Sequence, residues 1–281
     1  MRIVVTGSTG RLGGRVAARL AAAAVEQRLV VRDPSRAPVL PGSTVAVASY
    51  GDEDDLRDAL GPGDVVLFVS ASESPGRLDQ HRSFVQAAAA AGVGQLVYTS
   101  FYGAAHDATF TLARDHAATE DMIRERGLAY TFLRDNLYAD FVPLMAGADD
   151  VIRGPAGDGR AAVVAQDDIA DAAVAVLLDP GSHVGATYDL TGREALSFGR
   201  MAELLREVTG RPVRFENESI AEAYESRAVY DAPRWQLDAW VSTYTAVAAG
   251  ELARVTDDVR RLTGHEPRSL RSVLEGQQHQ T

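Results

Sequence analysis

Short runs of aliphatic and β-branched residues alternate with helical spacing along the first half of the chain. Leu12, Val16 and Leu20 recur at four-residue intervals after the first run, as on the buried face of a helix. Six runs are expected to be buried strands: Ile3–Val5, Leu29–Val31, Thr44–Ala48, Val65–Val69, Leu96–Thr99 and Tyr130–Leu133. Strands that alternate with helices predict an α/β fold, in which a doubly wound parallel sheet carries helices on both faces.

The alternation ends near Asp140, where Pro143 and several glycines mark loops. A helical pattern returns at Asp168–Leu178, and further helical segments between Ile220 and Leu274 predict a smaller, mostly helical C-terminal lobe. The polar tail that begins at Gly276 is expected to fray.

Composition removes several classes of chemistry. The chain of 281 residues has no cysteine, and all 28 of its basic Lys+Arg residues are arginine. Schiff-base chemistry, a Walker A phosphate loop, the Tyr-x-x-x-Lys pair of common short-chain dehydrogenases and of sugar-nucleotide epimerases, and any metal site built on cysteine are therefore excluded. His81 and His106 lack partners at metal-ligand spacing, and the acids are scattered over helical faces, so no metal is expected.

The net charge of −11 argues against nucleic acid or an anionic membrane surface as a partner of the whole fold. The longest segment without Asp, Glu or Arg carries too many glycine and polar residues to span a membrane. No targeting signal is visible, so the cytoplasm is the default expectation for location.

A glycine-rich turn lies between the first strand and the first helix. Its glycines follow the spacing G-x-x-G-x-x-G at Gly7, Gly10 and Gly13. The first would permit the tight turn, the second would let backbone amides approach a pyrophosphate, and the third would let helix and strand pack closely. The turn predicts a dinucleotide-binding Rossmann domain at residues 1–138, completed by return segments at about 161–190. Residues 139–281 would then form mainly the substrate-side lobe.

The second strand ends at a mixed pair of charges that decides which dinucleotide binds. Asp33 lies twenty residues after Gly13, as an acid that holds the ribose diol of NAD(H) would. Arg32 directly follows the strand, and Arg11 and Arg36 could complete a clamp for a 2′-phosphate. We favour NADP(H) over NAD(H), while Arg36 considered alone could equally be a solvated charge.

Further motifs match a known family. They are Val31-Arg32-Asp33-Pro34, Tyr50-Gly51-Asp52, Gln80-His81-Arg82, Tyr98-Thr99-Ser100, Leu112 to Glu120, and Thr131 to Tyr138. With the glycine turn, they resemble the NmrA-like atypical short-chain dehydrogenase/reductase family, and its quinone and triphenylmethane dye reductases in particular. The resemblance covers most of the first 190 residues and continues loosely after them. It implies an NADPH-binding Rossmann domain and a small lobe that closes over a planar acceptor.

The resemblance also implies roles for individual residues. The turn, taken as Gly7, Thr9, Gly10, Arg11, Leu12 and Gly13, would hold the pyrophosphate. Arg32 would hold the adenosine phosphate, and Ser70, Ala71 and Ser72 would line the dinucleotide. Asn136 and Tyr138 would face the nicotinamide.

Three residues are candidates for catalysis. Isoflavone-reductase-like relatives carry a catalytic lysine eleven residues before the glycine that corresponds to Gly127, a position that His116 occupies here. His116 either donates a proton or hydrogen bond to the developing oxyanion or only bonds to cofactor or backbone. Ser100 is either a polar residue of the site after the fifth strand or an ordinary strand-end cap. Tyr138 could supply a phenol.

Two functions remain open at this point. The first is transfer of hydride from NADPH directly to a quinone, azo or triphenylmethane acceptor, without flavin, since such acceptors need mainly proximity and orientation. The second is a non-catalytic NAD(P)-binding redox sensor of the NmrA type, which would bind a regulatory protein. The physiological acceptor and the oligomeric state stay undecided, with a homodimer as one alternative.

Overall fold

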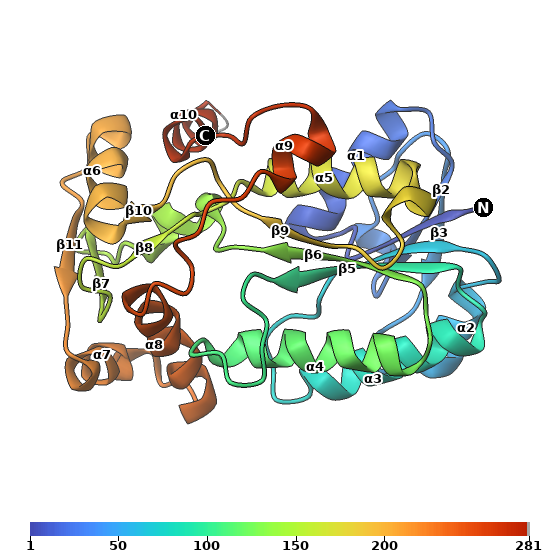
Figure 1. Cartoon of the computed structure of the whole chain (residues 1–281), viewed down its shortest axis with the longest axis horizontal. Coiled ribbons are helices and arrows are strands. Elements are labelled where there is room, and N and C mark those ends of the chain that lie inside the picture. The colour runs from blue at the N-terminus through green and yellow to red at the C-terminus, as the bar shows by residue number, and fades with distance from the viewer. Residues whose placement is uncertain (280–281) are drawn as a thin grey trace. The chain divides into compact units, whose positions relative to one another are not determined.

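The computed structural model describes residues 1–279 and contains a seven-stranded sheet (Figure 1). The strands lie in the order β3-β2-β1-β4-β5-β6-β9. In that order their bounds are Ser43–Val47, Gln27–Val31, Ile3–Thr6, Val65–Phe68, Gln95–Phe101, Tyr130–Asp135 and Thr187–Leu190.

The strands run parallel. β1 pairs in parallel with β2 and β4, β2 with β3, and β4 with β5. Backbone bonds from Leu96 to Ala129 and from Tyr102 to Asp135 keep one offset, so β6 runs parallel to β5. The chain order reverses between β1 and β4, and open parallel sheets bind ligands beyond the carboxyl ends of the strands at such a point. The predicted doubly wound α/β sheet is confirmed.

Helices cover both faces of this sheet. α1 (Arg11–Ala22) packs against α5 (Gln166–Leu178), and α2 (Glu53–Ala59) packs against α3 (Arg77–Ala90). Figure 1 shows α1 and α5 over one face, with α2, α3 and α4 (Thr111–Glu125) over the other. Right-handed crossovers between parallel strands produce this arrangement.

Strand β3 differs from its prediction as a buried strand. It lies at the edge of the sheet and pairs only with β2, so Val45 and Val47 are 46% and 50% exposed. Central strands are buried as expected, and the rings of Phe68 and Phe84 stack beside them at 4.0 Å. A β-branched run therefore predicted the strand but not its place in the sheet.

Local signals at two helix ends can be checked directly. Asp52 caps α2, because its carboxylate accepts the Asp55 amide at 3.1 Å, as the sequence predicts. The expected fraying from Gly276 is wrong for residues 276–278, because α10 (Leu270–Gln278) continues through them. Residues 280–281, the end of that predicted tail, lie outside the described residues.

Two compact units divide the chain. Unit 1 comprises Met1–Phe101, Asp115–Arg134 and Gln166–Tyr188, and unit 2 comprises Tyr102–Arg114, Asp135–Ala165 and Asp189–Thr281. In unit 2, β7 (Val151–Gly154) pairs in parallel with β11 (Arg214–Asn217), while β8 (Arg160–Ala161) pairs antiparallel with β10 (Leu196–Ser197).

Helices dominate the rest of unit 2. They are α6 (Phe198–Thr209), α7 (Ile220–Arg227), α8 (Arg234–Ala248), α9 (Asp258–Thr263) and α10. Short 3₁₀ turns lie at Pro34–Arg36, Ala139–Met145, Pro180–His183 and Ala228–Tyr230. Within residues 1–279, no helix combines the length and apolar character needed to cross a membrane.

Candidate functional site

The glycine turn has the backbone geometry that an anion site needs. Gly7 has φ +62°, which favours glycine, and its carbonyl accepts the Gly10 amide at 2.9 Å. A Cβ on Gly13 would lie 2.4 Å from the Gly7 oxygen, so no side chain fits there. The first turn of α1 carries no acidic residue, and its early amides have no partner within the helix. This end of α1 therefore offers amide donors and a positive dipole end to an anion.

The other predicted members of the turn differ in exposure. Leu12 is buried, Thr9 is half-buried and Arg11 is exposed. The Thr6 hydroxyl donates to the Leu67 carbonyl at 3.0 Å and accepts the Val69 amide at 3.0 Å. These two bonds join the ends of β1 and β4, and so fix the turn to the sheet.

The two charged residues after β2, Arg32 and Asp33, have different surroundings. The Asp33 carboxylate accepts the amide of Ser35 at 2.9 Å and its hydroxyl at 2.6 Å, which caps the following 3₁₀ turn. The Ser35 bonds lower the pKa of Asp33. Arg32 and Arg36 are both exposed. The acid is thus engaged in a local turn, while the two arginines face solvent beside it.

Two side chains of unit 1 hold the loop that follows β4. The Ser70 amide donates to Thr99 Oγ1 at 2.9 Å, and the Ala71 amide donates to His81 Nε2 at 2.9 Å. His81 must therefore carry its proton on Nδ1, which lies 2.8 Å from Thr119 Oγ1. Burial, followed by the charge of Arg77, lowers the pKa of His81 to about 3. His81 is consequently a neutral positioning group, which sequence analysis did not identify.

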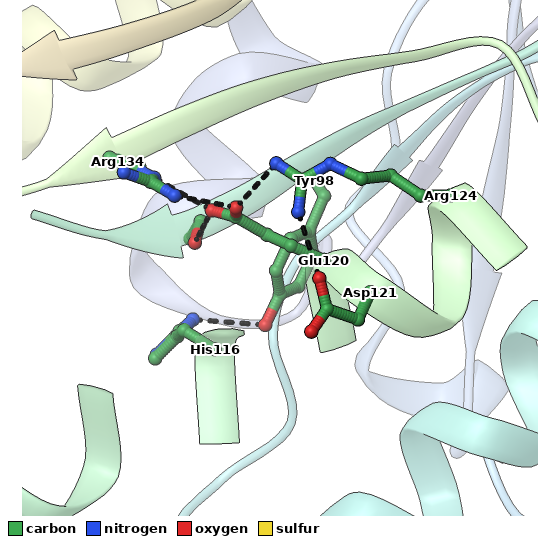
Figure 2. Close-up of polar contacts among 7 residues, drawn as sticks. Tyr98, His116, Glu120, Asp121, Arg124 and Arg134 are labelled. Carbon is green, nitrogen blue, oxygen red and sulfur yellow. Dashed lines mark hydrogen bonds and ion pairs between the residues drawn. The ribbon is translucent and has the colours of Figure 1, made fainter. Parts of the chain in front are cut away.

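His116 is also buried and fully engaged. Its Nε2 accepts from Arg77 Nη2 at 2.9 Å. Figure 2 shows its other contact, in which Nδ1 lies 2.9 Å from the Tyr98 hydroxyl. Because arginine only donates, the proton of a neutral His116 is on Nδ1 and is donated to Tyr98. Burial, with the charge of Arg77 as the next cause, lowers the pKa of His116 well below its usual value. Both ring nitrogens therefore bond within unit 1.

Arg77, at the start of α3, is the charged centre of this cluster. It is 4% exposed, its Nη1 lies 3.7 Å from Asp115 Oδ2, and its Nε has no hydrogen-bond partner among the described residues. Desolvation raises the pKa of Asp115. Arg77 is not among the residues predicted from the sequence, although a cation in the first turn of a helix, where acids are favoured, is a detectable signal.

Ser100 belongs to a buried ion-pair network. Its hydroxyl donates to Glu120 Oε1 at 2.7 Å. Arg134 forms a bidentate pair with the same carboxylate at 2.8 and 2.7 Å, and Arg124 adds a contact at 3.0 Å (Figure 2). The hydroxyl of Ser100 thus helps to hold a carboxylate that two guanidinium groups neutralise.

The end of β6 belongs to unit 2 from Asp135 onward. Asn136 is fully buried, donates from Nδ2 to the Leu252 carbonyl at 3.0 Å, and accepts the Leu137 amide at 2.7 Å. The Tyr138 hydroxyl donates to Asp135 Oδ2 at 3.1 Å. Asp135 Oδ1 is buried without a partner among the described residues, and burial raises the pKa of this carboxyl well above its usual value. Asp135 is not among the site residues predicted from the sequence.

The predicted site residues therefore fall into separate groups. Unit 1 contains the glycine turn, the arginines after β2, the loop at Ser70–Ser72, Ser100 and His116, whereas Asn136 and Tyr138 belong to unit 2. The buried groups that sequence analysis missed, Arg77 and Asp135, are neighbours of two predicted residues, His116 and Tyr138.

Comparison with known proteins places this geometry in a family. A family model described as NAD(P)H-binding matches residues 7–180. Quinone oxidoreductase 2 of Escherichia coli is 34% identical over 275 residues, which cover 95% of this chain and 96% of the relative. The NAD(P)H azoreductase of Xenophilus azovorans is 30% identical over 273 residues, with 95% of each chain covered.

Solved structures agree with the sequence comparison. An NADPH-dependent quinone oxidoreductase from Escherichia coli, crystallised with NADPH, has a TM-score of 0.89 at 32% identity and covers 98% of this chain and 99% of its own. The Citrobacter sp. triphenylmethane reductase complexed with NADP(H) has a TM-score of 0.86 at 30% identity, with coverage of 98% and 99%. The resemblance seen in the sequence is confirmed, and the chain belongs to the NAD(P)H-binding, NmrA-like family of oxidoreductases.

Proposed function

We propose that this NAD(P)H-dependent oxidoreductase transfers hydride from NADPH directly to a quinone or a related conjugated acceptor, without flavin. The observation that carries the proposal is the turn from Gly7 to Gly13, which offers helix amides to an anion and leaves no room for a side chain at Gly13. The names of the relatives, which act on quinones, azo compounds and triphenylmethane dyes, support this class of acceptor.

The residues around the turn fit a phosphorylated dinucleotide. The amides from Gly7 to Gly13 would hold the pyrophosphate, and Arg32, with Arg36 and Arg11, would hold the 2′-phosphate. Asp33 is engaged with Ser35, which disfavours its use as the ribose-diol acid of an NAD(H) site. Bound NADPH would supply the hydride from its nicotinamide ring. Ser70, Ala71 and Ser72 would line the dinucleotide beyond β4.

The roles of the candidate catalytic residues follow from their contacts. We assign His116 to positioning, because both of its ring nitrogens are bonded and burial keeps the ring neutral. Ser100 orders the Glu120 network. Tyr138 is the remaining candidate for contact with the acceptor. An acceptor that already has a low-lying electrophilic centre suits a site with this little acid chemistry.

The decisive experiment measures anaerobic oxidation of NADPH and NADH by the purified, flavin-free protein with a panel of quinones, azo compounds and triphenylmethane dyes. We expect acceptor-dependent turnover that prefers NADPH and needs no added flavin. Tight NADP binding without turnover on any acceptor would overturn the proposal in favour of the redox-sensor alternative. A requirement for added flavin would overturn the direct-transfer step.

The cofactor assignment can be tested separately at Arg32. Loss of a charge-assisted contact of about 1.5–3 kcal/mol predicts that Arg32→Ala weakens NADPH binding about 10- to 100-fold and leaves NADH binding unchanged. Arg57→Ala is the matched control, since this exposed arginine on α2 pairs only with its neighbour Asp54 among the contacts found. Equal losses for both cofactors would contradict the assignment, and a smaller parallel test at Arg36 would show whether it joins the clamp.

A further inference from the structure

The carboxyl group of Asp135 ends β6 and has one unused oxygen. Asp135 is 1% exposed, its Oδ2 accepts the Tyr138 hydroxyl at 3.1 Å, and its Oδ1 has no partner within residues 1–279. We propose that Asp135 and Tyr138 form a proton relay, in which Tyr138 gives a proton to the reduced acceptor and Asp135 restores it. This inference rests on the proposed function and names the groups that complete the reaction.

The surroundings of Asp135 favour a neutral carboxyl. Burial raises the pKa of Asp135 well above its usual value. The hydrogen bond from Tyr138 lowers this pKa, but it offsets only part of the effect of burial. The preceding Arg134 is bound to Glu120 instead. From the segment after β5, the Tyr102 amide bonds to the backbone carbonyl of Asp135, not to its carboxyl group. The charges of Asp189 and Arg254 act on the Tyr102 phenol.

A neutral carboxyl allows the hydrogen bond to reverse its direction. When Asp135 carries its proton on Oδ2, that proton can be donated to the Tyr138 oxygen, and the phenol proton can then be donated to another oxygen. Oδ1 is in this state a carbonyl oxygen, and a buried acceptor without a partner costs less than a buried donor without one. Tyr138 is half-buried, while Asp135 is enclosed, so the phenol is the member of the pair that can reach a ligand.

The relay supplies the proton that is needed, besides the hydride, to reduce a quinone to a hydroquinone. Addition of hydride brings two electrons and one hydrogen, and leaves the acceptor as a hydroquinone anion with its charge on oxygen. The O–H bond of Tyr138 breaks as an O–H bond forms on that oxygen, and the neutral hydroquinone results. Tyr138 then takes the proton of Asp135, and the Asp135 carboxylate takes a proton from water. A phenol is a suitable donor because its ordinary pKa, about 10, is similar to that of a hydroquinone.

A cationic triphenylmethane dye needs no such proton. Hydride adds to its central carbon, the positive charge is neutralised, and the colourless product forms directly. The two acceptor classes therefore separate the relay from hydride transfer itself. The relay should affect quinones and leave cationic dyes unaffected.

The test compares Tyr138→Phe and Asp135→Asn with the wild-type protein in single turnovers of NADPH with menadione and with malachite green. We expect Tyr138→Phe to slow menadione reduction about 100-fold and Asp135→Asn to slow it about tenfold, because a donor to the developing oxyanion or its proton source is lost. Malachite green reduction should be slowed at least tenfold less than menadione reduction by Tyr138→Phe, and less than menadione reduction by Asp135→Asn, because no proton is transferred to the dye. A solvent deuterium isotope effect should accompany menadione reduction only.

The matched controls are Tyr224→Phe and Asp238→Asn, which break another Tyr–Asp hydrogen bond of unit 2, 2.6 Å long. They should leave both reactions unchanged. Equal losses with both acceptors in the Asp135 and Tyr138 variants would show a purely structural role and overturn the relay. Unchanged menadione reduction would overturn it as well. If the wild-type protein reduces neither acceptor, the proposed function fails and the relay fails with it, which is a different result from either of the previous two.

Discussion

Two buried carboxyl groups of this protein have opposite surroundings. Glu120 and Asp135 are each 1% exposed. Glu120 accepts from Ser100, Arg134 and Arg124, so both of its oxygens are bonded (Figure 2). Asp135 accepts only from Tyr138, and its second oxygen has no partner in the described part of the chain.

The number of hydrogen-bond partners distinguishes buried groups that stabilise the fold from buried groups that are candidates for catalysis. A buried ion pair with its remaining positions filled is costly to disturb, because the loss of one partner leaves a charge in the protein interior. His81 and His116 resemble Glu120 in this respect, since each uses both ring nitrogens within unit 1. A buried titratable group with an unused position and a shifted pKa is a candidate member of a functional site.

The largest expected effect comes from replacing the satisfied carboxyl. Glu120→Gln should destabilise the protein by about 3 kcal/mol, because the amide cannot neutralise Arg134 and Arg124 and its NH₂ group opposes their donors. Chemical denaturation measures this loss. Glu125→Gln, at an exposed position of the same helix, is the control and should cost less than about 0.5 kcal/mol. If Glu120→Gln left the stability unchanged, the contrast between the two carboxyl groups would be wrong.

A smaller effect is expected at His81. At about pH 7.5, His81→Phe should cost about 1–3 kcal/mol, because the Ala71 amide and the Thr119 hydroxyl lose their partner. The cost should shrink by about 1.4 kcal/mol at about pH 5.5. In the unfolded protein His81 binds a proton near its ordinary pKa, whereas in the folded protein its pKa is about 3. Lowering the pH to about 5.5 therefore favours the unfolded state of the wild-type protein, and it has no such effect on the variant, which lacks this histidine.

The control for the two pH values is His279→Gln, which replaces an exposed histidine. This control should show the same change in stability as the wild-type protein from about pH 7.5 to 5.5, since it leaves His81 and its two partners in place. A constant gap between wild type and His81→Phe over that range would mean that folded His81 takes up a proton, and would contradict its assignment as a neutral positioning group.

The smallest effect on stability is expected at Asp135, whose carboxyl group has an unused oxygen. Its replacement should stabilise the protein, whereas the replacements of Glu120 and His81 should destabilise it. The raised pKa of Asp135 means that folded protein keeps a proton that unfolded protein releases at neutral pH, so this residue lowers stability as the pH rises. Asp135→Asn removes that penalty and should stabilise the protein by on the order of 1 kcal/mol at about pH 8, with a smaller gain at about pH 5. Thermal unfolding at both pH values, with the exposed Asp107→Asn as control, measures the gain. A loss at about pH 8 comparable to that of Glu120→Gln would show that the two carboxyls are equivalent.

Local patterns predicted the fold better than they predicted the site. The strand before Gly7, the close packing at Gly13 and the cap at Asp52 each depend on neighbours within a few residues, and all three are found. The exposure of β3 depends on which strand lies beside it, so its composition could not reveal an edge position.

The buried polar groups depend on contacts between distant segments. Arg77 and His116 are 39 residues apart, and a charged residue in a helical pattern is usually solvated, so no local pattern indicates that the two meet in the interior. Asp135 lies within a motif that drew attention to Asn136 and Tyr138 instead. Its unused oxygen is a property of everything packed around it, which no local pattern describes.

The bonds that hold the loop after β4 determine what that loop can offer a ligand. Ser70 and Ala71 have already given their amide hydrogens to Thr99 and His81. At these two residues the backbone is left with carbonyl oxygens, whereas the start of α1 offers amide hydrogens. A dinucleotide bound as proposed would therefore meet backbone donors at its phosphates and backbone acceptors beside Ser70 and Ala71, so the two places differ in hydrogen-bond polarity.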